Sequence, residues 1–171
     1  MLEIIQFWVN TPRAHKMKAP SYQPLSQEET PQWNENNWRI ALVQGEWNGY
    51  QSPIQSHHPL RIANLQCNET GASIDLPMPE NWSGILYVLS GAIQVSNARA
   101  SGRQMMVIGT GVTSTITLAA EEDTRVLFLS SAPLEEPVVS HGPFVLSTYE
   151  DVQKAIMDYH NGKMGNLEEG S

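Results

Sequence analysis

The sequence has one cysteine, few charged side chains and no long apolar run, and each shortage excludes a class of protein. The single cysteine, Cys67, excludes a disulfide within the chain, and no basic or helix-terminal setting near it favours a reactive thiolate. No apolar run approaches the roughly 18 residues of a membrane helix. Residues 1–10 are apolar but lack the basic start and the small-residue cleavage site of a secretory signal. The sequence therefore predicts a cytoplasmic protein without a membrane span.

Basic side chains are scarce as well. Ten lysines and arginines stand against 18 aspartates and glutamates, which gives a net charge of −8. Recognition of a nucleic-acid backbone rests on clustered Lys and Arg, and here these residues are scattered, so we expect no direct binding to nucleic acid. With 171 residues, 40% of them hydrophobic, the chain is long enough to form one domain with a buried core.

Short apolar segments at regular spacing predict an all-β protein. Residues 2–10 are rich in Ile, Phe, Trp and Val and predict a buried strand, and a proline-rich connection follows over 11–31. Residues 38–44 alternate as a half-buried strand does. Further strands are expected near 60–66, 72–76, 84–90, 92–97, 104–108, 113–118 and 125–130. Such a series is typical of a barrel or sandwich.

One helix is expected, late in the chain. Ser147 and Glu150 have the spacing of a capping box, in which each side chain satisfies the other's backbone amide. An apolar stripe follows at helical spacing, and basic residues and a glycine mark its end: Val152, Ala155, Ile156, Tyr159, His160, Gly162 and Lys163. We therefore divide the chain into a strand and extended arm (1–36), a barrel (37–146), a helix (147–165) and a flexible tail (166–171).

Several segments together resemble the pirin family, two-barrel members of the cupin superfamily. They are QFWVNTP (6–12), GASIDLPMPENW (71–82), YVLSG (87–91), LFLSSAPLEEPVVSHGPFVLST (127–148) and DYHNGKMG (158–165). The resemblance covers only the second half of a full-length pirin. It implies a single cupin-type β-barrel of jelly-roll form. It also implies that the metal-bearing first barrel, with its three histidines and a glutamate, is missing.

The cupin metal motif can still be laid on this chain. From Gly71, its two histidine positions fall on Pro77 and Pro79, its glutamate position on Gly84, and its closing glycine on Gly91. In the second motif, aligned from Gly111, the histidine position falls near Glu122. Proline and glycine side chains offer no donor to a transition metal, and one carboxylate cannot hold iron. We therefore predict no metal, no cofactor and no catalytic residue.

Other side chains leave alternatives open. The histidines 57 and 58 would point to opposite faces of a strand and are expected in a solvated loop, His15 is expected to be exposed, and His160 ends the helix. His141 could line a pocket or hold a structural hydrogen bond. The rim carboxylates could form an acid–base pair, although solvated loops are commoner: Asp75, Glu80, Glu121 and Glu122. The tryptophans could line a pocket, although core positions are favoured: Trp33, Trp38, Trp47 and Trp82.

These observations favour a non-catalytic binding or regulatory module that acts through protein contacts. Loss of the first barrel would uncover apolar surface, so we expect a homodimer with residues 2–10 near the contact, or a protein partner that replaces the missing barrel. The alternative is a metal-dependent dioxygenase of the quercetinase kind, an activity associated with metal-bearing pirins. It would need a partner first barrel or a non-standard metal site among the histidines.

Overall fold

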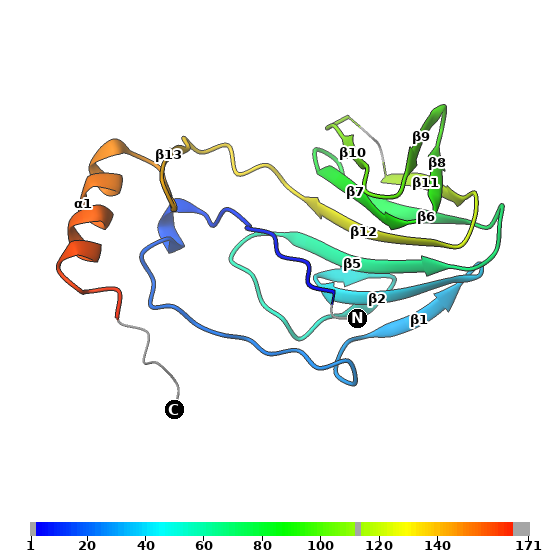
Figure 1. Cartoon of the computed structure of the whole chain (residues 1–171), viewed down its shortest axis with the longest axis horizontal. Coiled ribbons are helices and arrows are strands. Elements are labelled where there is room, and N and C mark those ends of the chain that lie inside the picture. Colours follow the sequence, from blue (N-terminus) through cyan, green and yellow to red (C-terminus); the bar gives the residue numbers. More distant parts are fainter. Residues whose placement is uncertain (1–2, 112–113, 166–171) are drawn as a thin grey trace. The chain divides into compact units, whose positions relative to one another are not determined.

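The computed structural model describes residues 3–111 and 114–165, which form two compact units (Figure 1). One unit is Ser21–Pro133, called here the barrel unit. The other combines Met1–Pro20 with Leu134–Ser171 and is called the terminal unit. The predicted tail over 166–171 lies outside the described residues. Within the described ranges, no helix has the length and apolar character needed to cross a membrane.

The barrel unit consists of two antiparallel sheets and a short hairpin (Figure 1). The larger sheet has the order β1 (Gln32–Glu35), β2 (Trp38–Gln44), β5 (Leu60–Cys67), β12 (Thr124–Ser131), β7 (Ser83–Ser90) and β10 (Met105–Ile108). The smaller has the order β6 (Ser73–Met78), β11 (Ser114–Ala120), β8 (Ala92–Val95) and β9 (Ala98–Ser101). The hairpin joins β3 (Glu46–Trp47) to β4 (Tyr50–Gln51). Strands distant in sequence lie next to each other, as in a jelly roll.

The core lies between the two sheets, because alternate residues of each strand point inward. Strand β2 contributes Trp38, Ile40 and Leu42, which are fully buried. Side chains from both sheets join them in one apolar cluster, which includes Leu65, Leu76, Leu86, Ile93, Leu118 and Phe128. The Cys67 thiol is buried there and donates to the carbonyl oxygen of Glu69 at 3.3 Å.

A close backbone approach fixes the turn between β7 and β8. Gly91 has φ +77°, and a Cβ there would overlap the carbonyl oxygen of Asp123 and the side chain of Thr124. Thr124 is fully buried, and its hydroxyl donates to the carbonyl oxygen of Glu122 at 2.7 Å and accepts from the amide of Ala92 at 3.2 Å. Only glycine fits at position 91.

The terminal unit is built around one helix. Helix α1 (Tyr149–His160) buries Val152 and Ala155 against Leu146 of the hairpin β13 (Val139–His141) and β14 (Phe144–Leu146). Ile156 packs at the edge of this cluster. Tyr159 is 62% exposed, so the predicted apolar stripe is shorter than expected. Gly162 has φ +71° just past the helix end, as predicted.

The prediction of the helix cap was wrong by one residue. The N-cap is Thr148, whose hydroxyl accepts from the amide of Asp151 at 3.1 Å and donates to that carboxylate at 2.7 Å. Ser147 is 4% exposed, and its hydroxyl has no hydrogen-bond partner in the described structure. Both residues are followed by an acid three positions later, so the local pattern fits two registers. Packing, which buries Ser147, selects the second.

The prediction of a buried strand at 2–10 was also wrong over the described residues, 3–10. This segment has no regular secondary structure, and its apolar side chains are exposed: Ile4 by 77%, Ile5 by 43%, Phe7 by 40%, Trp8 by 72% and Val9 by 48%. An apolar run becomes a buried strand only where a neighbouring strand and a covering layer are available. In the terminal unit this segment, called here the apolar arm, finds neither.

Hydrogen bonds fix the segment that follows the apolar arm. The amide of Arg13 donates to the Glu136 carboxylate at 2.7 Å, and the ammonium of Lys16 donates to the carbonyl oxygen of Val145 at 3.1 Å. Partial burial lowers the pKa of Lys16, although the nearby charge of Glu136 acts in the opposite direction. His15 lies in a short 3₁₀ turn (Arg13–His15) and is half-buried, so its predicted exposure was wrong.

Candidate functional site

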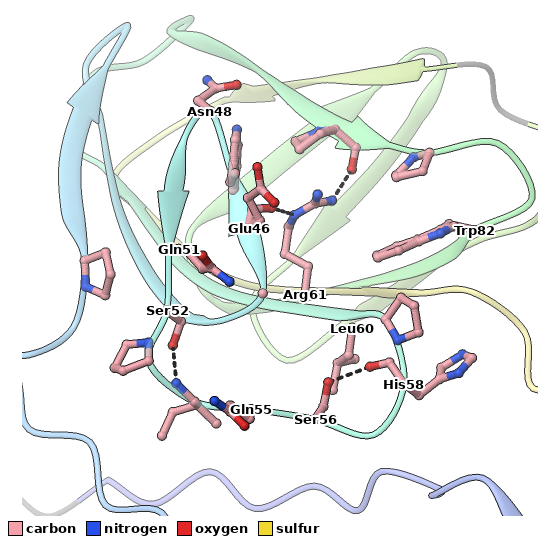
Figure 2. A pocket seen from close by; sticks show the side chains of 18 of the residues that line it. Glu46, Asn48, Gln51, Ser52, Gln55, Ser56, His58, Leu60, Arg61 and Trp82 are labelled. Atoms are coloured by element: carbon pink, nitrogen blue, oxygen red, sulfur yellow. Dashed lines mark hydrogen bonds between the residues drawn. The ribbon is translucent and has the colours of Figure 1, made fainter.

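The barrel unit has an open pocket of about 1280 Å³. Its walls come from the segment before β1, the β3–β4 hairpin, the loop over 52–59, the start of β5, and the end of β6 with the segment after it (Figure 2). A pocket of this size accommodates a small organic molecule. The side chain that distinguishes it is Arg61.

Arg61 is a buried cation at an inward-facing position of β5. It precedes Ala63 and Leu65 in the same alternation, and it is only 8% exposed. Its Nε donates to the carbonyl oxygen of Glu46 at 2.7 Å, and its Nη1 donates to that of Pro77 at 2.7 Å (Figure 2). These two bonds tie β5 to the β3–β4 hairpin and to β6.

Two further contacts complete the surroundings of the guanidinium. Its Nη1 lies 3.4 Å from the hydroxyl oxygen of Ser130 on β12, a long hydrogen bond. Its Cζ lies 5.4 Å from the ring centroid of Trp82, in the range of a cation–π interaction. The side chain is therefore held from several sides.

No carboxylate neutralises this cation by direct pairing within the described part of the chain. The ion pairs there involve Arg13, Arg99 and Lys163, and none reaches Arg61. Burial lowers the pKa of Arg61, and only the more distant charge of Glu46 opposes that effect. Glu46 is exposed, so water screens its charge. The result is a positive charge with few protein counter-charges, placed at a pocket wall.

Both adjacent histidines line the pocket, a role that was not predicted from the sequence, which favoured a solvated loop. His57 is exposed and His58 is half-buried. The Nε2 of His58 lies 2.7 Å from the carbonyl oxygen of Ala132. A carbonyl can only accept, so Nε2 carries a proton. His141 is exposed on β13 and His160 ends the helix, and both belong to the terminal unit.

The residues at the cupin ligand positions do not fit a transition metal. On β6 the burial pattern places Leu76 and Met78 in the core, with Pro77 half-buried between them, and Pro79 is half-buried at the pocket. Gly84 packs against Met78, whose Cε would lie 3.3 Å from a Cβ added there. Glu122 is exposed on a turn. Aliphatic and thioether side chains do not make an iron site.

Among the described residues, no three His, Cys, Asp or Glu side chains are placed so that they could hold one metal ion. No reaction step through a metal can therefore be built on these residues. That the chain binds no metal stays a prediction, which metal analysis tests.

The rim carboxylates each have separate surroundings. Asp75 accepts from the hydroxyl of Thr117 at 2.7 Å, and Glu121 forms an ion pair with Arg99. Glu80 and Glu122 are exposed, and none of the four lines the pocket. The structure gives no support to an acid–base pair among them.

Both interpretations of the tryptophans apply, to different residues. Trp38 and Trp47 are buried in the core, and Trp33 packs against it and stacks on Tyr50 with 4.3 Å between ring centroids. Trp82 is half-buried and lines the pocket, and the buried Trp47 also contributes to its wall.

Sequence reasoning missed Arg61, although a signal was present. The strand LRIANLQC places Arg61 in the same phase as three small or apolar residues, Ala63, Leu65 and Cys67. A charged side chain in the core-facing phase of a strand needs a special environment, because burial of an unpaired charge is unfavourable.

The chain matches the family model described as the Pirin C-terminal cupin domain over residues 63–165. It belongs to the pirin family. This confirms the resemblance, and the antiparallel barrel confirms the predicted all-β, cupin-type fold. Pirin of Rattus norvegicus is 31% identical over 94% of this chain and 56% of its own length. Pirin-like protein 2 of Arabidopsis thaliana is 30% identical over 94% of this chain and 52% of its own length.

Among solved structures, a quercetin 2,3-dioxygenase from Acinetobacter baumannii is 30% identical, with a TM-score of 0.86 over 94% of this chain and 56% of that one. The chain thus spans about half the length of the curated relatives it matches. The family model covers most of the barrel unit from β5 onward together with the C-terminal helix, and it assigns this part to the Pirin C-terminal cupin domain.

Proposed function

We propose that this chain is a non-catalytic binding or regulatory module of the pirin family that acts through protein contacts. The observation that carries this proposal is the apolar arm, which exposes five large apolar side chains within residues 4–9, Trp8 by 72% among them. Contiguous exposed apolar surface commonly marks an interaction site in soluble proteins. Two copies pair through this arm, or a protein partner covers it.

The donor chemistry of the barrel supports the non-catalytic part of the proposal. The positions where cupins gather metal ligands hold Pro77, Pro79 and Gly84, and the neighbouring core-facing positions hold Leu76 and Met78. None of these side chains can activate oxygen or transfer a proton. The barrel then serves as a rigid scaffold.

The oligomeric state tests the pairing. Light scattering on the full chain at micromolar concentration should give the mass of a dimer, and Trp8→Ser should shift it to the monomer. Tyr22→Ser is the matched control, because Tyr22 is 88% exposed but lies outside the arm. A wild-type chain that is monomeric, with no partner needed for solubility, contradicts the proposal.

Metal analysis tests the non-catalytic part. Protein purified without chelator should contain far less than one iron per chain when measured by inductively coupled plasma spectrometry. A value near one iron per chain would overturn it, because a site outside the cupin positions would then have to exist.

A second candidate is a dioxygenase of the quercetinase kind, which the name of the similar Acinetobacter baumannii structure suggests. It requires a partner first barrel or a non-standard metal site. Iron-loaded chain, alone and with a first-barrel protein, is mixed with a flavonol under oxygen. Loss of flavonol absorbance in the mixed sample only would assign this chain a supporting role in an enzyme.

A further inference from the structure

We propose that the pocket around Arg61 binds a small organic monocarboxylate, whose carboxylate pairs with the guanidinium while its apolar part packs along Trp82, Pro77 and Pro79. This proposal rests on residues of the barrel unit alone, and it is argued independently of the protein contacts proposed above. The cupin metal motif does not include Arg61.

The first argument is the uncompensated charge. Arg61 is 8% exposed, and no carboxylate pairs with it in the described residues. A buried charge is strongly unfavourable unless a partner of opposite sign offsets the loss of hydration. Burial accordingly lowers the pKa of Arg61. A carboxylate that enters the pocket supplies the missing partner.

The second argument is the set of donors that remain. A guanidinium carries five N–H groups. The Nε of Arg61 is engaged by Glu46 and one N–H of Nη1 by Pro77, while the second contact of Nη1, to Ser130, is long at 3.4 Å. The Nη2 has no hydrogen bond to any residue that the structure describes. Nη2 and Nη1 can each donate one N–H to a carboxylate. Two parallel hydrogen bonds of this kind, one to each carboxylate oxygen, are the usual geometry of an arginine–carboxylate pair.

The third argument is preorganisation. Two backbone carbonyls and the ring of Trp82 already hold the guanidinium (Figure 2). Binding therefore does not have to order a flexible side chain, which is a large part of the usual cost of forming an ion pair. The apolar surface next to it, from two prolines and a tryptophan, suits a flat apolar group.

The charges of the other lining residues select a monoanion. Among the residues that the structure describes, Arg61 is the only lysine or arginine that lines the pocket, whereas Glu29 and Glu46 both line it. Both carboxylates are exposed and hydrated, so they weaken an anion's binding without neutralising Arg61. A dianion such as phosphate would be repelled more strongly than a monocarboxylate, and it would gain nothing from the apolar wall.

Benzoate is the probe, and the indole N–H signal of Trp82 in a nitrogen-15 spectrum is the readout, assigned with Trp82→Phe. Benzoate should shift this signal saturably. Benzamide, which has the same shape and no charge, should bind at least about tenfold more weakly, as expected for loss of a charge-assisted hydrogen bond pair. Inorganic phosphate should also bind more weakly than benzoate.

Variants separate the charge from the shape of the pocket. Arg61→Gln should weaken benzoate binding at least about tenfold. Glu46→Gln, at an exposed position, should keep the fold and tighten binding about two- to fivefold, because it removes a like charge. Arg99→Gln is the control, since Arg99 is exposed and pairs with Glu121, which does not line the pocket.

The outcome does not depend on whether Arg61→Gln folds. Equal affinity for benzoate and benzamide in the wild-type chain overturns the proposal, and so does unchanged affinity in Glu46→Gln. Absence of any saturable shift of Trp82 overturns it as well. A monomeric wild-type chain that binds benzoate would contradict the pairing proposed above and leave this site intact.

Discussion

The Nη1 of Arg61 donates to the carbonyl oxygen of Pro77 at 2.7 Å, and this hydrogen bond joins β5 of one sheet to β6 of the other. Pro77 stands where the cupin motif places its first histidine. Its side chain offers nothing to a metal ion, and its backbone oxygen is engaged by the protein's own cation. The stretch from Gly71 to Gly91 thus keeps the two glycines of the motif. At its first histidine position, the backbone contacts the guanidinium of Arg61.

Truncation of this cation should destabilise the barrel. Arg61→Ala leaves the carbonyl oxygens of Glu46 and Pro77 without their donor, and an unsatisfied buried acceptor costs about 1–3 kcal/mol. We expect the free energy of unfolding in urea to fall by about 2 kcal/mol or more. Arg99→Ala, which removes only an exposed ion pair, should change it by less than about 1 kcal/mol. A more stable Arg61→Ala would mean that the cost of burying the charge exceeds the value of its bonds.

The closing glycine of the motif should be irreplaceable for steric reasons. Gly91→Ala forces a Cβ onto the backbone of Asp123 and Thr124 at a φ of +77°. We expect a loss of at least about 2 kcal/mol in unfolding free energy, since strain and overlap add. Gly109→Ala is the matched control, because nothing lies within 4 Å of a Cβ there and its φ is not in the left-handed region. Similar midpoints for the two variants in a urea titration would show that the turn relaxes.

Substitutions at the two candidate N-cap residues of α1 should affect the stability of the helix differently. Thr148→Ala removes the acceptor for the amide of Asp151 and should weaken the helix by about 1 kcal/mol. Ser147→Ala removes a buried hydroxyl that has no hydrogen-bond partner in the described structure, and should be neutral or stabilising. Hydrogen exchange of the α1 amides measures the difference locally. Faster exchange in Ser147→Ala than in Thr148→Ala would restore the capping box predicted from the sequence.

Long alternating strands could be predicted from the sequence. The alternation over 38–44 coincides with β2, and the strands expected near 60–66, 84–90 and 125–130 lie within β5, β7 and β12. Each of these strands has one face in the core, so burial imposes a period of two on the residue types.

Shorter elements carried no such period. Strands β3 and β4 have two residues each, and the turn residues around Asn48 predict a reversal but not the pairing. The strand β1 follows the proline-rich segment, within the part of the chain expected to be an extended arm, and is fixed by its pairing with β2. Position in the sheet, more than local sequence, decides such elements.

The exposure of the apolar arm and the position of Arg61 at a pocket could not be predicted from the residue pattern. Residues 3–10 have the composition of a buried strand, but composition does not say whether a partner strand exists. Arg61 has the phase of a core residue, but the pocket that receives it is formed by Pro77 and Trp82 from distant segments. Both depend on contacts far apart in the sequence.

A turn at the pocket wall should lose its hydrogen bonds in acid. The amide of Ser26 donates to the Glu29 carboxylate at 3.0 Å, and the amide of Glu29 donates to the Ser26 hydroxyl oxygen at 3.2 Å. The backbone bond from Ser26, followed by the side-chain contact, lowers the pKa of Glu29 below its ordinary value of 4.5. The ionised form therefore stabilises the turn, and this contribution is complete above pH 4.5 and lost as the pH falls through the lowered pKa.

Nuclear magnetic resonance measures this turn directly. The amide shift of Ser26 should follow a titration with its midpoint below 4.5, and Glu29→Gln should abolish that titration without changing the barrel spectrum. A midpoint at or above 4.5 contradicts the hydrogen bond.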